Sequence, residues 1–244
     1  MASKHQLLHD LYQKKIQDIV LNEVISSPLL VHPECKNMST DIMFVGQETN
    51  GFYGTWENFI ERGVVAQMDI YKQFMEDEYP AMNNLFFQYI HKLMKNSQNL
   101  PVWNNLYKFD LGDNSDKRNV SKAKPDELKI IQSFHDGLLA KEIKIIQPKI
   151  IIFFTGHVYD KLFFDPLVVR DGDYKLLYQP IDALKEQNID EWKCCQLGLN
   201  HFEGFEDFKG KAIRTYHPLY LNRTSYKETI LAYLVNEIKS VVQG

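Results

Sequence analysis

The sequence predicts an α/β protein with a three-layer αβα sandwich around a central, mainly parallel sheet of four strands. Short, continuously apolar segments recur along the chain, which is typical of strands that are covered on both faces. These segments alternate with stretches of helical periodicity, as in a doubly wound sheet. A chain of 244 residues that is 44% hydrophobic and 25% charged can bury a substantial core, so we expect a single domain over residues 1–244.

The N-terminal part is predicted to supply one strand between helical segments. From Lys4 to about Ile25, apolar residues keep a helical spacing, which predicts an amphipathic helix. Asp41–Val45 is short and apolar and is followed by Gly46, which indicates a buried strand. Helical spacing resumes between Phe52 and Asn96, where Pro80 is expected to start a fresh helix because proline suits the first helical turn.

Three further strands are predicted in the rest of the chain. Pro101–Lys108 alternates and then enters a polar stretch, so we expect a second strand followed by an exposed loop over Asp110–Lys124. A helix is predicted over Pro125–Gln147. Pro148–Gly156 repeats the pattern of a buried strand that ends in glycine, and Ala212–Tyr216 repeats the buried pattern before His217 and Pro218.

Residues 157–211 are predicted to form an insertion in the domain. Within it we expect a hairpin around Arg170–Tyr174 and a strand near Cys194–Leu197. The chain is expected to close with a helix over Ser225–Val242, because Ser225 and Glu228 have the spacing of a capping box.

Composition narrows the class of protein. A net charge of −4 and a pI near 6.1 argue against a protein that coats nucleic acid through its overall field, although two cationic stretches, 117–124 and 209–227, could contact phosphates. The N-terminus has no apolar signal-peptide core, and the longest apolar run, Ile150–Phe154, is too short to cross a bilayer. We therefore expect a cytoplasmic protein with no membrane partner. Three cysteines make no disulfide framework.

The ligand of a doubly wound sheet binds outside the carboxyl ends of its strands. The loop Gly46–Gly51, Asn105, Gly156 and His217 all follow predicted strands, so we expect them on one rim. The loop Gly46–Gly51, which follows a buried strand and carries a carboxylate, is predicted to form the floor of a pocket.

Five features of the chain resemble the uracil-DNA glycosylase superfamily over roughly the whole sequence. They are Gly46–Glu48 at the first strand end, Asn105 and Lys108 after the second, the Pro148–Gly156 strand, and His217-Pro218 before the last helix. The resemblance implies the fold of that superfamily and an enzyme of base excision repair that hydrolyses the N-glycosidic bond of uracil or another altered base. DNA is the implied partner. No cofactor is implied, because the iron–sulfur branches need four cysteines.

The resemblance assigns the catalytic roles to Glu48 and His217. Breaking the base–sugar bond develops positive charge on the sugar, which the Glu48 carboxylate would stabilise while it orients a water molecule. The departing pyrimidine carries negative charge on a carbonyl oxygen, to which His217 would donate a hydrogen bond. The alternatives are a glutamate in a surface ion pair or helix cap, and a histidine that bonds to the backbone beside Pro218.

Four further residues are predicted to bind the base. Asn105 would read its pairing edge through the donor and acceptor of the amide, with Asn104 as a rival one register step away. Gln47 would contact the base, and Phe52 or Tyr53 would stack against it. The alternatives are a capping asparagine, a glutamine at a loop hinge and aromatic residues of the core.

Three residues are predicted to contact nucleic acid. Lys108 and Arg223 offer positive charge, and Leu221 has the place of an apolar wedge that replaces the flipped base in some members of the superfamily. No metal site is predicted, because His157 and His201 lack partners at metal-ligand spacing.

Two loops depart from the pattern of the superfamily. Thr49-Asn50 stands where a proline is usual, and Leu219-Tyr220 replaces the small residue expected after Pro218. An acidic run, Glu203, Glu206 and Asp207, would oppose a close phosphate backbone. Two alternatives therefore stay open: a non-catalytic member of the fold that binds nucleic acid, a nucleotide or a protein, and an unrelated αβα hydrolase with Glu48 and His217 as an acid–base pair.

Overall fold

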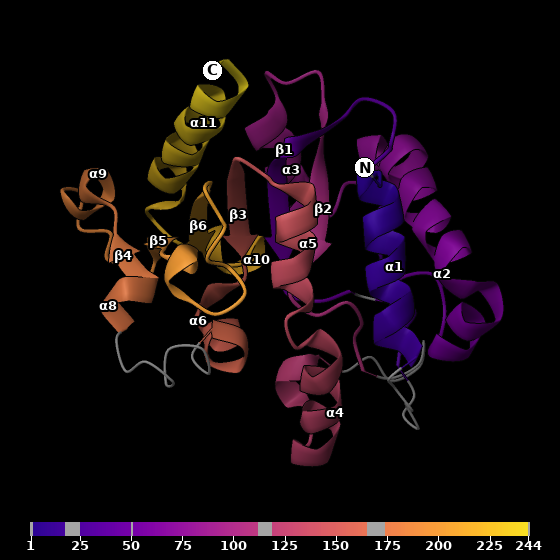
Figure 1. The fold of residues 1–244 in the computed structure, drawn as a ribbon. Helices are drawn as coiled ribbons and strands as arrows, with labels where there is room; N and C mark the ends of the chain where they lie inside the picture. Colours follow the sequence, from indigo (N-terminus) through magenta and orange to yellow (C-terminus); the bar gives the residue numbers. More distant parts are fainter. Residues whose placement is uncertain (1, 18–24, 50, 112–118, 165–173, 244) are drawn as a thin grey trace.

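A six-stranded mixed sheet runs through the centre of the molecule, in the order β2-β1-β3-β6-β5-β4 (Figure 1). The structure is a computed structural model that describes residues 2–17, 25–49, 51–111, 119–164 and 174–243. Its strands are β1 Met38–Gly46, β2 Leu100–Asn105, β3 Ile150–Phe154, β4 Tyr178–Pro180, β5 Cys194–Leu197 and β6 Lys211–Thr215. Strands β2, β1, β3 and β6 are parallel, whereas β5 and β4 are antiparallel to their neighbours. The α/β class and the four parallel strands agree with the prediction.

Helices flank the sheet. They are α1 Lys4–Gln17, α2 Trp56–Gln73, α3 Leu85–Met94, α4 Pro125–His135, α5 Leu138–Ile146, α6 Gly156–Tyr159, α8 Tyr174–Leu177, α9 Asp182–Lys185, α10 Pro218–Leu221 and α11 Lys227–Gln243. Helix α1 packs against α5 and α2, while α3 packs against α11 and α10. In Figure 1, α5 lies in front of the central strands. In the described part of the chain, no helix is both long and apolar enough to cross a membrane.

The sheet is larger than predicted because residues 157–211 extend it. The strand expected near Cys194–Leu197 is present as β5, and it joins β6 to the short edge strand β4. The hairpin expected around Arg170–Tyr174 lies outside the described residues, except for Tyr174, which begins α8. The insertion thus contributes an antiparallel extension to an otherwise parallel sheet.

Several helix boundaries differ from the prediction. The helix predicted over Pro125–Gln147 is broken into α4 and α5 by Gly137, whose φ of 62° is left-handed and suits glycine. Pro80 lies in a 3₁₀ turn, Tyr79–Ala81, and α3 begins only after Asn84, whose side chain accepts a hydrogen bond from Phe87 N at 3.0 Å.

The two ends of the chain also differ from the prediction. Helix α1 ends at Gln17, residues 18–24 lie outside the described part, and Ile25 forms an isolated β-bridge with Leu111. Helix α11 begins at Lys227 rather than at Ser225.

The stretch predicted as an exposed loop is partly core. Strand β2 ends at Asn105, and Leu106, Phe109 and Leu111 continue from it as buried residues. Residues 112–118 lie outside the described part, and Val120, beyond them, is also buried. The chain after β2 is therefore packed against the rest of the molecule, and this packing shapes the edge of the sheet.

The core lies on both sides of the parallel strands. Every residue of β3 is fully buried, as are Met43, Phe44 and Val45 of β1. Burial of each such side chain contributes about 1.5–3 kcal/mol. At the open side of β2, the Tyr71 hydroxyl from α2 accepts a hydrogen bond from Trp103 N at 3.0 Å and donates one to Trp103 O at 2.9 Å. A side chain thus satisfies the backbone of this edge strand.

Candidate functional site

The parallel strands bring the predicted site residues to one edge of the sheet. Gly46 at the end of β1 pairs with Asn105 at the end of β2, and Phe154 at the end of β3 pairs with Thr215 at the end of β6. Gln47 and Glu48 follow β1 directly, and His217 follows β6. We call this region, from which β2, β1, β3 and β6 all exit, the carboxyl edge.

The Glu48 carboxylate is held by three donors at the carboxyl edge. Its Oε1 accepts hydrogen bonds from Tyr159 OH and Asn119 Nδ2, both at 2.5 Å, and its Oε2 accepts one from Val120 N at 2.6 Å. Burial raises the pKa of this carboxyl group to about 7, against the opposing effect of these hydrogen bonds. A carboxylate offers about four lone-pair positions, so one position remains for a water molecule or a ligand.

His217 is a neutral hydrogen-bond donor near pH 7. Its Nδ1 accepts a hydrogen bond from Leu219 N at 3.3 Å, which places the proton of the neutral ring on Nε2. Burial lowers the pKa of this imidazole to about 4. The ring stacks on Phe86 with the ring centres 6.1 Å apart, and no residue in the described part of the chain engages Nε2.

Asn105 lies beside Gly46 with an unused donor. A Cβ atom added at Gly46 would lie 2.4 Å from Asn105 Oδ1 and 3.3 Å from the Phe86 ring, so only glycine allows this close approach. Asn105 is 1% exposed, and its Nδ2 has no hydrogen-bond partner among the described residues. Phe86 therefore stacks on His217 and also lies near the Gly46 Cα position that faces Asn105.

The neighbouring Asn104 is committed to a buried network instead. Its Nδ2 donates to Glu142 Oε2 at 3.1 Å, and its Oδ1 accepts from Asn105 N at 2.8 Å and from Lys108 Nζ. Glu142 also accepts a hydrogen bond from Tyr12 OH at 2.6 Å. Of the two asparagines, only Asn105 therefore has an amide nitrogen without a partner among the described residues.

The remaining base-binding candidates differ in how available they are. Gln47 Nε2 donates to Thr155 O at 2.6 Å, so its amide ties the residue after β1 to the residue after β3. Phe52 is 7% exposed and packs edge-on against Trp103, with ring centres 5.7 Å apart, as a core residue does. Tyr53 is 38% exposed and its hydroxyl donates to Glu78. Tyr53 thus has the more accessible ring.

Two of the residues predicted to contact nucleic acid are buried inside the protein. The Lys108 side chain is fully buried, and its Nζ lies 2.7 Å from Glu142 Oε2, so its charge is neutralised inside the protein. Burial also lowers the pKa of this ammonium group. Leu221 is 0% exposed and packs in the core, so it cannot act as a wedge in this conformation. Arg223 is exposed, as the prediction requires.

Arg214, from the second cationic stretch, is also removed from the surface. It is fully buried, and its guanidinium group lies 2.9 Å from Asp160 Oδ2. Residues 117 and 118 of the first stretch lie outside the described part. In the acidic run, Asp207 lies 2.7 Å from Lys144 of α5, so this carboxylate is partly neutralised.

A clamp on the loop after β1 was not predicted. Asp110 is buried; its Oδ1 accepts a hydrogen bond from Thr49 Oγ1 at 3.2 Å, and its Oδ2 accepts one from Gly51 N at 3.0 Å. The Thr49 hydroxyl also lies 3.1 Å from Ser26 Oγ. Hydrogen bonds thus restrain the loop at Thr49 and Gly51.

Two other contributors to the site were missed. Tyr159 lies five residues after the end of β3 at Phe154, on α6, and Asn119 comes from the stretch predicted as an exposed loop. The position of Tyr159 just past a predicted strand was a usable signal. No sequence pattern indicated the role of Asn119, because only the packing of the residues after β2 brings its side chain to Glu48. Thr155 adds a buried hydroxyl that has no partner among the described residues.

Comparisons with known proteins identify no family for this chain. Neither a scan against models of protein families nor a search of curated proteins gives a match. Within the described residues, no group of three or more histidines, cysteines, aspartates or glutamates could hold a metal ion.

Proposed function

We propose that this chain hydrolyses the N-glycosidic bond of uracil or another altered base in DNA, after the base has been flipped to the carboxyl edge. The proposal rests on the resemblance to the uracil-DNA glycosylase superfamily and on one observation. The same edge of the sheet holds the neutral imidazole of His217 and the buried amide of Asn105, and neither Nε2 nor Nδ2 has a hydrogen-bond partner among the described residues. Two donors of this kind suit a ligand that presents carbonyl oxygens, such as a pyrimidine.

The chemistry assigned to His217 needs a donor that stays neutral. A histidine with a pKa of about 4 carries no charge at pH 7 and can donate its Nε2 proton to an oxygen on which negative charge develops. Removal of one such donor typically lowers the rate of an enzyme by about 100-fold to 1000-fold. Asn105 would hold the same base through its amide, which distinguishes an oxygen from an amino group at the pairing edge.

The chemistry assigned to Glu48 needs a carboxylate that can hold a water molecule. Three of its acceptor positions are occupied, and the fourth suits one water molecule, which the carboxylate would orient toward the sugar. With a pKa of about 7, Glu48 is half ionised at neutral pH and can accept a proton. The ionised form would also stabilise positive charge on the sugar.

One observation favours the non-catalytic alternative. Each Glu48 oxygen already has a donor, so the carboxylate also serves as a latch that joins the loop after β1 to residues 119–120 and to α6. The burial of Lys108 and Leu221 removes two contacts that an enzyme acting on duplex DNA would use. In this alternative the carboxyl edge binds a nucleotide, a nucleic acid or a protein without chemistry.

The deciding experiment incubates the protein with single-stranded and double-stranded oligonucleotides that contain uracil or other altered bases, and then cleaves abasic sites. The proposal expects strand cleavage that falls at least about 100-fold in Glu48→Gln and in His217→Leu. Glu34→Gln and His201→Leu, which change exposed residues elsewhere, are the matched controls and should keep wild-type activity.

The outcomes separate the two functions. Cleavage no greater than in the absence of protein on every substrate, with no effect of either substitution, rejects the enzyme. Binding of an oligonucleotide that weakens as salt is raised, without cleavage, supports the non-catalytic alternative, because phosphate contacts release counterions.

A further inference from the structure

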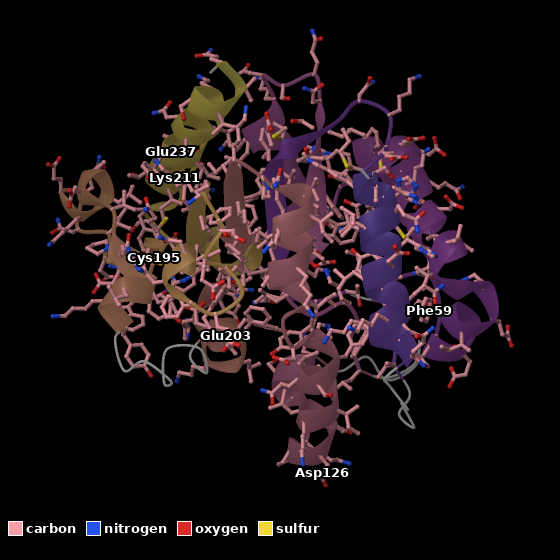
Figure 2. The ribbon with its side chains drawn as sticks, in the orientation of Figure 1. Phe59, Asp126, Cys195, Glu203, Lys211 and Glu237 are labelled. Atoms are coloured by element: carbon pink, nitrogen blue, oxygen red, sulfur yellow. The ribbon has the colours of Figure 1, made fainter. Side chains whose placement is uncertain are left out.

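A second concave site lies along α5, away from the carboxyl edge. Here a cavity of about 520 Å³ separates α5 from the segment 204–210, which leads into β6. The segment runs beside the helix: Gly204 lies against Ala140, Asp207 pairs with Lys144, and Gly210 lies against Pro148. Figure 2 labels Glu203 and Lys211, the residues on either side of this segment, with Glu203 below Lys211 in the view. The volume falls in the range of small-molecule sites, about 300–1000 Å³.

The walls of this cavity are held in place by the backbone. A Cβ atom added at Gly210 would lie 2.6 Å from Pro148 O, so the segment passes the start of β3 at a distance that only glycine permits. Lys211 N donates to Lys149 O at 2.9 Å, and Phe208 N donates to Phe205 O at 2.9 Å. The cavity is thus formed before any ligand binds, which lowers the cost of binding.

The floor of the cavity is apolar. Ala140, Ile143 and Phe205 line it and are nearly fully buried, and Phe208 adds a half-buried ring. An apolar floor of this kind binds hydrocarbon or an aromatic ring through the removal of apolar surface from water.

The rim of the cavity has one lysine, Lys209, that forms no ion pair within the described part of the chain. Its charged lining residues are three lysines, Lys144, Lys149 and Lys209, and one aspartate, Asp207. Lys144 is paired with Asp207 at 2.7 Å, and Lys149 with Asp41 at 3.0 Å. Lys209 thus gives the rim a positive charge to offer to a ligand.

We propose that this cavity binds a small amphipathic anion, with an apolar body against Ala140, Ile143 and Phe205 and a carboxylate or phosphate group beside Lys209. The site is independent of the function proposed for the carboxyl edge. It also gives the end of the 157–211 insertion a role, since residues 204–210 form one wall.

The methyl groups of Ala140 and Ile143 allow a direct test. The full-length protein, labelled with ¹³C at alanine and isoleucine methyl groups, is titrated with octyl phosphate, with octanoate, with octan-1-ol and with inorganic phosphate. Saturable shifts of both methyl signals are expected with octyl phosphate, octanoate or both, which tells a phosphate head group from a carboxylate. Octan-1-ol and inorganic phosphate should bind at least about fivefold more weakly, because octan-1-ol has no anionic group and inorganic phosphate has no apolar chain.

Two variants and one control complete the test. Ala140→Phe fills the cavity and should abolish the shift at Ile143. Lys209→Glu changes an exposed side chain, so the variant is expected to fold as the wild type does. This substitution should weaken binding at least about fivefold. Lys95→Glu, an exposed lysine outside the lining, should bind as the wild type does. The proposal is overturned if neither anion shifts the two methyl signals, if octan-1-ol binds equally well, or if Lys209→Glu leaves the affinity unchanged.

Discussion

Replacement of Lys108 by methionine tests how the carboxyl edge is supported from within. The ammonium group of Lys108 is fully buried 2.7 Å from Glu142 Oε2 and donates to Asn104 Oδ1. Methionine keeps the volume of the side chain but removes the charge. The Glu142 carboxylate is then left buried with only the Tyr12 hydroxyl, at 2.6 Å, and the Asn104 amide, at 3.1 Å, as donors.

The expected cost of Lys108→Met follows from this geometry. Removal of one partner of a buried ion pair costs about 3–5 kcal/mol, because the other charge is left without compensation. For a chain of this size, about 2–4 °C of melting temperature is lost per kcal/mol, so we expect a fall of roughly 6–20 °C. Neutralisation of Glu142 in the double variant Lys108→Met/Glu142→Gln should recover at least about half of the loss, since the Tyr12 hydrogen bond can remain.

Urea unfolding followed by circular dichroism measures both free energies of unfolding. The matched control is Lys95→Met, in which an exposed lysine is replaced and a change within about 0.5 kcal/mol is expected. A loss below about 1 kcal/mol in Lys108→Met, or a double variant less stable than the single one, would refute the account of Lys108 as the buried partner of Glu142.

Four further predictions follow from the contacts at the carboxyl edge. The folded-state pKa of Glu48 is raised from 4.5 to about 7. The contribution of Glu48 to stability is therefore fully present below about pH 4.5 and is lost as the pH rises through 7. The free energy of unfolding of Glu48→Gln, relative to that of the wild type, should increase by about 1–3 kcal/mol between pH 5 and pH 8. Tyr159→Phe removes a donor to the charged form, so the Glu48 pKa, followed by ¹³C NMR of its carboxyl carbon, should rise further, and a fall would contradict the contact. Thr49→Val should cost about 1–3 kcal/mol by removing the donor to Asp110 Oδ1, whereas Thr49→Ser should cost less, as urea unfolding can show. Gly46→Ala should displace the Asn105 amide, because the added carbon would lie 2.4 Å from Oδ1; unchanged amide chemical shifts at Asn105 would argue against this close approach.

The apolar strands were the most predictable part of the fold. Ile150–Phe154 is a continuous apolar run, and it is fully buried as β3 because both of its faces meet helices or neighbouring side chains. The break between α4 and α5 also has a sequence signal, since Asp136-Gly137 is typical of a turn within a helical pattern.

The side-chain contacts of polar residues near the site are less predictable from the sequence. The residues around Lys108 do not indicate whether its side chain faces solvent or the core. Its partner Glu142 lies 34 residues away, on a helix whose packing cannot be predicted from the local sequence. Asp110 meets Thr49 across 61 residues of chain. Asn104 and Asn105 differ only by one step of register, which turns the side chain to the opposite face of the strand.

Both edges of the sheet are closed to strands from other molecules. At one edge, β4 is three residues long and ends at Pro180, which has no N–H group to offer to an incoming strand. At the other edge, the Tyr71 hydroxyl occupies both the N–H and the carbonyl group of Trp103 in the middle of β2. A second chain that pairs with β2 would have to displace this hydroxyl, so Tyr71→Phe is expected to expose a template for intermolecular pairing at this edge.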